Sequence, residues 1–296
     1  MRLTEEQVKR FRDEGVLVVE NVVTEDDLAP VIAEYEGWID RRARELQAEG
    51  KIAALHEGEP FTRRFGLLYA QCREIERGLD IMQARGPATF AFLGNENLLD
   101  AVECLVGPEI TCSPIQHIRA KLPSALAPEI AGKGDTHIVP WHQDMGVTWA
   151  EADPHFILTV WVAMVDANLE NGCMEVMPGV FRHGYREHQA EGGTTIRADL
   201  LPDVPPRPVP VRKGGAVFMH RYTPHRSTPN RTDEVRWSID LRYQKTGTPT
   251  GRPFHPDFVV RSRAHPETVL TDPATWARLW EEALSQPPPR HAHRVK

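Results

Sequence analysis

The sequence predicts a mainly β protein, a β-sandwich or jelly roll, with helices packed outside it. The first hundred residues carry apolar residues at helical spacing. From about residue 110 the pattern changes to short β-branched segments separated by turn residues. The 25 prolines are concentrated in the second half of the chain, a distribution typical of short strands and turns. Helices followed by many short strands are therefore expected.

Capping signals place two helices in the first fifty residues. Thr4, followed three positions later by a glutamine, fits a capping box, and Gly15 would end the helix that begins there. Residues 16–23 are β-branched and strand-like. Thr24 is followed by an aspartate at the same spacing, so a second helix is expected to run into the forties.

The change to strands follows a last helical stretch around residues 95–106, which Gly107 and Pro108 close. Asn171 and Gly172 form a strong hairpin-turn signal between two strand candidates. The strand candidates are residues 110–122, 157–165, 174–177, 216–220 and 236–243.

These elements predict one domain over residues 1–285. Its parts would be a mostly helical lead-in over 1–109, a β core over 110–245 and a C-terminal extension over 246–285. The proline-rich end, residues 286–296, is expected to be a disordered tail.

The charge, the apolar runs and the cysteines of the chain indicate which kinds of partner and which compartment to expect. The formal net charge is −7 and the chain has no block of like charges, so a nucleic-acid partner is disfavoured. No apolar signal region opens the sequence, and the longest nearly apolar run, residues 156–165, is too short to cross a bilayer. The four cysteines form no CxxC pair. A cytoplasmic protein with reduced thiols and no membrane partner is therefore expected.

A candidate metal site begins at His142 and Asp144. In a strand, residues i and i+2 point to the same face, so the imidazole and the carboxylate can be presented together. The pair alone is a weak signal, but His225 lies downstream and would complete a 2-His-1-carboxylate facial triad, the ligand set of non-haem Fe(II) oxygenases. His220 is an alternative distal ligand, although its setting in an apolar strand favours a structural role.

Arg236 is a candidate carboxylate clamp. A guanidinium can bind a carboxylate with two parallel hydrogen bonds, which an ammonium cannot. Around it the strand alternates, with one polar face (Arg236, Ser238, Asp240, Arg242) and one apolar face. Arg231 and Arg242 are alternatives for the clamp.

The order and spacing of several segments resemble the phytanoyl-CoA dioxygenase family of Fe(II)/2-oxoglutarate oxygenases. The segments that carry the resemblance are Leu3 to Val8 with Phe11 and Gly15, Lys121 to Pro123, Trp141 to Asp144, Val160 to Ala163, Asn171 to Gly179, His183-Gly184, and His225 to Arg236. The chain departs from the family at Phe181, where a histidine is common, and over residues 149–156.

The resemblance implies a double-stranded β-helix core, a cupin-like jelly roll, with the helical region packed outside. It also implies that His142, Asp144 and His225 hold the iron, and that Arg236, eleven residues after the last ligand, grips the far carboxylate of 2-oxoglutarate. Three further residues are expected to contact the co-substrate or substrate: Ser227, Lys121 and Gln116.

The resemblance further implies an enzyme that uses Fe(II), 2-oxoglutarate and O₂. Because Asp144 retains the carboxylate that halogenases of this class lack, hydroxylation of a small-molecule metabolite or natural-product intermediate is expected, with release of succinate and CO₂. Two alternatives stay open. One is a cupin-type iron oxygenase that needs no 2-oxoglutarate, and the other is a non-catalytic jelly-roll module that binds a ligand.

Overall fold

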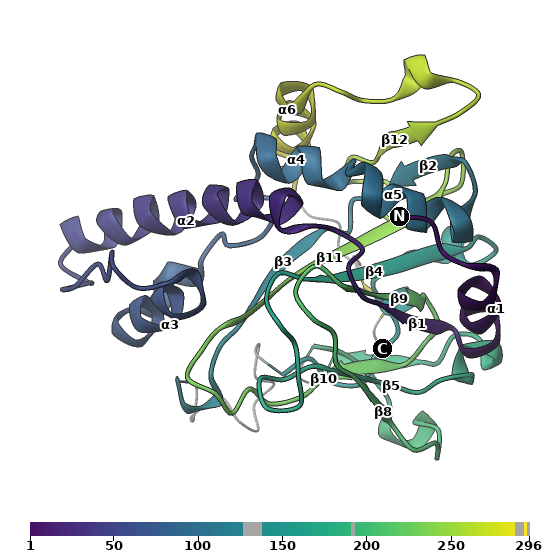
Figure 1. Ribbon diagram of the computed structural model, residues 1–296, viewed down its shortest axis with the longest axis horizontal. Coiled ribbons are helices and arrows are strands. Elements are labelled where there is room, and N and C mark those ends of the chain that lie inside the picture. The colour runs from purple at the N-terminus through teal and green to yellow at the C-terminus, as the bar shows by residue number, and fades with distance from the viewer. Residues whose placement is uncertain (127–137, 191–192, 288–292, 295–296) are drawn as a thin grey trace.

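The computed structural model describes residues 1–126, 138–190, 193–287 and 293–294 (Figure 1). Its strands form three antiparallel sheets. The large sheet has the order β1 (Val16–Val19), β9 (Ala216–His220), β4 (Ile157–Ala163), β11 (Arg236–Lys245), β2 (Glu109–Cys112) and β12 (Phe258–Ser262), with β3 (His117–Lys121) also paired to β11. The second sheet has the order β10 (His225–Ser227), β5 (Met174–Val176) and β8 (Arg207–Val209), and the third pairs β6 (His188–Ala190) with β7 (Thr194–Ile196).

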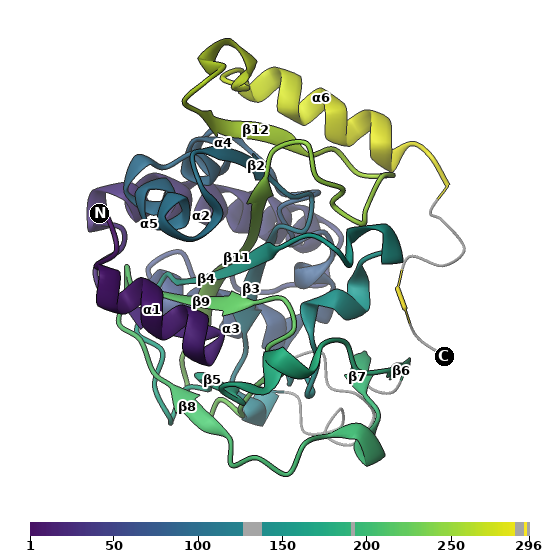
Figure 2. The same cartoon turned by 90° about the vertical axis from the view of Figure 1, so that its right-hand side faces the viewer.

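Helices cover one face of the large sheet. In both views α2, α4 and α5 lie on one side of it and the sheet of β5, β8 and β10 lies on the other (Figures 1 and 2). The α-helices are α1 (Glu5–Glu14), α2 (Glu25–Ala48), α3 (Phe61–Gln71), α4 (Pro87–Leu93), α5 (Glu96–Val106) and α6 (Pro273–Leu284). The 3₁₀ turns are η1 (Arg73–Glu76), η2 (Ser124–Leu126), η3 (Asp144–Val147), η4 (Ala150–Ala152), η5 (Val180–His183), η6 (Ala198–Leu200) and η7 (Pro266–Thr268). The expected jelly roll with outer helices is confirmed.

The first two helices begin at the expected caps. The side chains of Thr4 and Thr24 each accept a hydrogen bond from the backbone N–H three residues later, and the side chain of that residue bonds back to the cap. Gly15 ends α1 with a φ of 70°, in the left-handed region that favours glycine. The strand that follows is shorter than expected and ends at Val19.

Two strand expectations are wrong. Residues 110–122 form two strands, β2 and β3, which pair with different parts of β11. The pair Asn171-Gly172 does not close a hairpin, because the strands on either side, β4 and β5, belong to different sheets. Gly172 still has a steric role: its φ is 86°, and a Cβ there would lie 2.6 Å from the carbonyl oxygen of Thr228.

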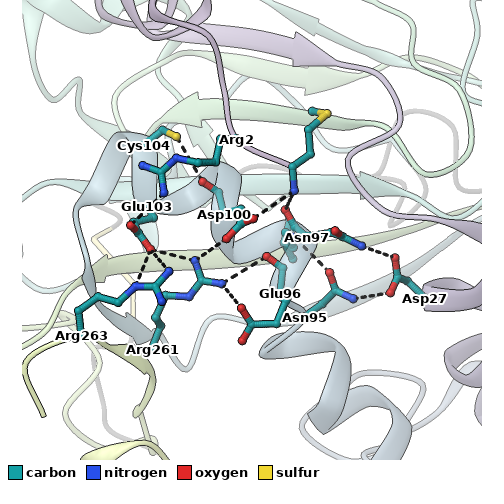
Figure 3. A network of polar contacts seen from close by, with 12 residues as sticks. Arg2, Asp27, Asn95, Glu96, Asn97, Asp100, Glu103, Cys104, Arg261 and Arg263 are labelled. Carbon is teal, nitrogen blue, oxygen red and sulfur yellow. Dashed lines mark hydrogen bonds and ion pairs between the residues drawn. The ribbon is translucent and has the colours of Figure 1, made fainter. Parts of the chain in front are cut away.

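The lead-in and the C-terminal extension both contribute to the large sheet. Val16 to Val19 pair with β9 at one end, and β12 pairs with β2 at the other. Figure 3 shows how α5 is tied to β12. Arg261 on β12 is 5% exposed and forms ion pairs with Glu96, Asp100 and Glu103 of α5. This network of charges fixes the helix against the edge of the sheet.

The end of the chain returns to the body of the protein. Of the tail expected to be disordered, residues 288–292 and 295–296 lie outside the described residues, whereas Arg294 is in contact with the fold. Its backbone N–H donates to the carbonyl of Gly146 at 2.8 Å, and its guanidinium pairs with Asp153 at 2.9 Å. The segment that follows Asp144 is thus held by the C-terminal residues.

Two further sequence expectations concern cysteines and membranes. All four cysteines are free thiols, two buried and two half-buried. In the part of the chain that the structure describes, no helix combines the length and the apolar character needed to cross a membrane.

The apolar face of β11 is the centre of the larger core. Trp237 is fully buried, stacks on Phe61 at a centroid distance of 4.5 Å and meets Phe65 edge-on at 5.3 Å. Its indole N–H donates to the carbonyl of Phe61 at 3.1 Å. This contact joins α3 to the middle strand of the sheet.

Replacing Trp237 with alanine should therefore lower the free energy of unfolding by about 3–5 kcal/mol, because it removes a large buried ring and leaves a cavity. Urea denaturation of the variant measures this loss. The matched control is Leu169→Ala at a position that is 61% exposed, where a change within about 0.5 kcal/mol is expected. Equal effects of the two substitutions would contradict the assignment of Trp237 to the core.

Candidate metal centre

Two histidines far apart in the sequence face each other across a short antiparallel contact. His142 and His225 form an isolated β-bridge, in which each backbone N–H donates to the carbonyl of the other residue at 3.0 Å. Their rings lie side by side, with centroids 4.1 Å apart. His225 is also the first residue of β10. The bridge thus aligns two imidazoles on one side of the second sheet.

Asp144 joins the histidines through a turn. We expected His142 and Asp144 on one strand, and this is wrong: the backbone is extended at Gln143 and turns into η3 at Asp144. The carboxylate still reaches the imidazoles. Its Oδ1 lies 4.0 Å from Nε2 of His142 and 3.9 Å from Nε2 of His225, and one ligand atom from each of the three residues lies within 4.8 Å of the others.

The orientation of both rings suits metal binding. Nδ1 of His142 lies 2.8 Å from the carbonyl of Pro140, and Nδ1 of His225 lies 3.0 Å from the carbonyl of Thr223. Because a carbonyl only accepts, each Nδ1 carries the proton and each Nε2 presents its lone pair toward Asp144. Burial, and next the neighbouring His225, lower the pKa of His142 to about 3. Neutral imidazole is the form that coordinates metal.

Asp144 is held in its ionised form. Burial alone would raise the pKa of its carboxyl group, but the charge of Arg242 lowers it below the usual value. Thr159 on β4 donates a hydrogen bond to Oδ2. Two neutral imidazoles and one carboxylate are the donor set of non-haem Fe(II) centres, so the residues fit the predicted iron site.

Arg236 lies in the same cavity as the triad and is 4% exposed. Its Nη1 donates to Ser238 at 2.9 Å, and its guanidinium lies over the ring of Trp161 at 4.9 Å. Within the described part of the chain, no carboxylate comes within 4.0 Å of this group. Burial lowers the pKa of Arg236 to about 10, so the side chain remains cationic at neutral pH. A buried cation of this kind is unfavourable without a partner, so an anionic ligand would stabilise it.

Two more expected residues lie beside Arg236. Lys121 stands opposite it in the β3–β11 register, and its Nζ donates to the hydroxyl of Ser227 at 3.0 Å. That hydroxyl also accepts from the backbone N–H of Val139 at 2.8 Å. All three side chains line the cavity that contains the triad. The structure therefore brings together six of the seven expected site residues.

Gln116 is the exception. Its side chain is fully buried and donates to the carbonyl of Ser113 at 2.9 Å. Gln116 is not among the residues that line the cavity. Its position therefore does not support a contact with a co-substrate.

Two alternatives, His220 for the third metal ligand and Arg231 for the carboxylate clamp, lie in other surroundings. His220 packs against the rings of Phe156 and Phe181, with centroids 5.3 and 4.8 Å away, and burial lowers its pKa to about 4. Phe181, the departure from the family pattern, thus packs on a structural histidine. Arg231 is exposed on a loop.

Arg242 is a site residue whose contact the sequence did not reveal. Its Nη2 donates to Oδ1 of Asp144 at 2.5 Å, and its guanidinium also pairs with Asp240 at 2.7 Å. The alternation along residues 236–242 carried a usable signal, because it places Arg242 on the face of Arg236. Only the pairing of β11 with β4 shows that this position reaches Asp144.

The cavity lies between the two larger sheets. Its volume is about 290 Å³, and side chains of β3, β4 and β11 meet those of β5 and β10 around it. Apolar groups such as Phe65, Leu79 and Met174 share the lining with charged groups. A space of this size suits a small molecule beside the metal ligands.

Comparison with known proteins agrees with the fold. The family model described as phytanoyl-CoA dioxygenase (PhyH) matches residues 11–238. The peroxisomal phytanoyl-CoA dioxygenase of Rattus norvegicus is 26% identical over 250 residues, which cover 81% of this chain and 68% of the rat protein.

Two solved structures share the architecture. The non-haem monooxygenase ThoJ in its apo form aligns with a TM-score of 0.65 and 20% identity over 94% of this chain and 95% of ThoJ. The epimerase SnoN from nogalamycin biosynthesis, solved with Fe³⁺, α-ketoglutarate and nogalamycin RO, aligns with a TM-score of 0.56 and 21% identity over 83% of this chain and 86% of SnoN. At these identities the likeness shows the fold.

His142→Ala should weaken the binding of Fe(II) or Mn²⁺ on the order of a hundredfold or more, because it removes one of three protein ligands. Isothermal titration with Mn²⁺ under argon measures this change. The control is His183→Ala, at an exposed histidine outside the cavity, which should bind Mn²⁺ as the unaltered protein does. Unchanged affinity in His142→Ala would contradict the triad.

Proposed function

The chain belongs to the phytanoyl-CoA dioxygenase family, and we propose that it hydroxylates a small-molecule metabolite or natural-product intermediate while 2-oxoglutarate is converted to succinate and CO₂. Family membership and the His142, Asp144 and His225 cluster make it a non-haem iron enzyme that uses 2-oxoglutarate and O₂. Bound there, the iron supplies O₂ activation and the oxidation of a C–H bond.

The observation that carries the proposal is the buried guanidinium of Arg236 in the cavity of the triad. A cation at 4% exposure without a carboxylate partner among the described residues is costly. A dicarboxylate co-substrate supplies the missing charge. An iron oxygenase that needs no 2-oxoglutarate, or a non-catalytic module, would leave this charge unexplained.

The residues around Arg236 prepare it for a carboxylate. The ring of Trp161 supports one face of the guanidinium, and Ser238 accepts from Nη1. These contacts reduce the freedom of a long side chain before the ligand arrives. Lys121 and Ser227 add an ammonium and a hydroxyl at the same end of the cavity, so both charge and hydrogen bonds favour an anion there.

The rest of the cavity lining supports a small substrate. Phe65 and Leu79 offer apolar surface, whereas Arg119 and Asp240 offer charged groups. Walls of this mixed kind position one C–H bond and exclude water from the reaction. Because the ligand set includes Asp144, no coordination position is left to a halide in its place, which favours hydroxylation over halogenation.

Arg236→Lys tests the co-substrate. The ammonium keeps the charge but loses the fork, so the apparent KM for 2-oxoglutarate should rise at least about tenfold while Mn²⁺ affinity is retained. Succinate formation at varied 2-oxoglutarate measures this. Arg231→Lys, on an exposed loop, is the matched control and should leave KM unchanged. If KM is unaltered in Arg236→Lys, the residue that clamps the carboxylate of 2-oxoglutarate would be Lys121 or Arg242 instead.

Product analysis tests the reaction type. A panel of small molecules is first scored by stimulated 2-oxoglutarate turnover, and the best substrate is then converted under ¹⁸O₂. Hydroxylation should add one ¹⁸O atom to the product for each succinate formed. A product without a new oxygen atom, formed with the same succinate yield, would replace hydroxylation with a desaturation, cyclisation or epimerisation on the same scaffold.

A further inference from the structure

Arg242 lies beside the metal ligands, but it is neither a member of the triad nor the clamp for 2-oxoglutarate. It sits on the polar face of β11, directly opposite Thr159 of β4, and it is 4% exposed. Both residues contact Asp144. Thr159 donates to Oδ2, and Nη2 of Arg242 donates to Oδ1 at 2.5 Å. Both carboxylate oxygens therefore have a donor from the large sheet.

The oxygen that Arg242 contacts is the one that a metal needs. Oδ1 of Asp144 lies 4.0 and 3.9 Å from Nε2 of His142 and His225. Two ligands that each lie about 2.1 Å from one ion would be closer to each other than these distances, unless they stood almost opposite one another. The three ligands must therefore close around a metal ion, and the ion must share Oδ1 with a guanidinium or displace it.

A second acceptor for Arg242 is already in place. Asp240, two residues earlier on the same face of β11, pairs with its Nη1 at 2.7 Å. The side chain of Asp240 is 14% exposed, against 6% for Asp144. Neither Asp240 nor Arg242 points into the apolar core, since both line the cavity. The guanidinium thus stands between two carboxylates, and only one of them belongs to the triad.

The charge of Arg242 affects how tightly the triad can bind a metal ion. A cation in contact with Asp144 opposes the binding of a divalent ion to the same carboxylate, because like charges repel strongly in a site shielded from water. Asp240 offsets this repulsion when the guanidinium is drawn toward it. The balance between the two carboxylates would then set how tightly the triad holds its metal.

We propose that Arg242 is a positioning residue that competes with the metal ion for Asp144, and that Asp240 retains the guanidinium when the metal binds. The pair keeps metal affinity below the value that the triad alone would give. This inference rests on the metal site of the proposed function, but it concerns two residues that are not ligands.

Three variants and one probe test the inference: Arg242→Gln, Asp240→Asn and the double variant, each titrated with Mn²⁺ without 2-oxoglutarate. Arg242→Gln should bind Mn²⁺ at least about tenfold more tightly, because the competing charge is gone. Asp240→Asn should bind it at least about threefold more weakly, because Arg242 keeps only Asp144 as a partner. The double variant should follow Arg242→Gln, since Asp240 acts largely through Arg242.

The sign of the change separates this role from structural damage, which would weaken metal binding in Arg242→Gln. Arg242→Lys should return the affinity toward that of the unaltered protein. Arg236→Gln is the matched control: it removes a buried charge from the same cavity without a contact to Asp144, and its change should stay within about threefold.

Equal or weaker Mn²⁺ binding in Arg242→Gln would overturn the inference. If that variant does not fold, Asp240→Asn decides, and an unchanged affinity there overturns the inference equally. Absence of Mn²⁺ binding in the unaltered protein would instead contradict the metal site itself, so the two failures are distinguishable.

Discussion

The arrangement of the molecule depends on β11, a strand that is buried along both of its faces. One face carries Trp237, Ile239, Leu241 and Tyr243, all with no exposed surface, and these side chains pack beneath the helices. The other face carries Arg236, Asp240 and Arg242 and lines the cavity. A strand with charges on one buried face requires polar groups in the layer that it meets, and β10 provides them with His225 and Ser227.

Burial makes the charges of this cavity interdependent. An ionised group removed from water is stable only with a partner, so each charge constrains its neighbours. Arg242 forms ion pairs with Asp144 and Asp240, whereas Arg236 has no carboxylate partner among the described residues. The unbalanced cation and the carboxylate-bearing triad lie in one space. The proposed function follows from this imbalance, because a divalent metal and a dicarboxylate together supply the missing charges.

The segment that carries Asp144 is held by distant parts of the chain. The backbone of His142 is fixed by its bridge to His225, and the turn after Asp144 is bonded to Arg294 near the C-terminus. Thr159 and Arg242 fix the carboxylate itself. A ligand on a turn is thereby positioned by contacts from four other segments, which explains how a short 3₁₀ turn can serve a metal site that demands defined geometry.

The sequence by itself determined the local features. The caps at Thr4 and Thr24 and the alternation along residues 236–243 depend on neighbouring residues, and all three were predicted. The membership of His142, Asp144 and His225 in one site followed from residue types and their order. Only the tertiary structure decided which segments pair: it separated β4 from β5, divided residues 110–122 into two strands, and brought Arg242 to Asp144. These outcomes depend on contacts between residues far apart in the chain. A local sequence pattern does not show which of these contacts is most favourable.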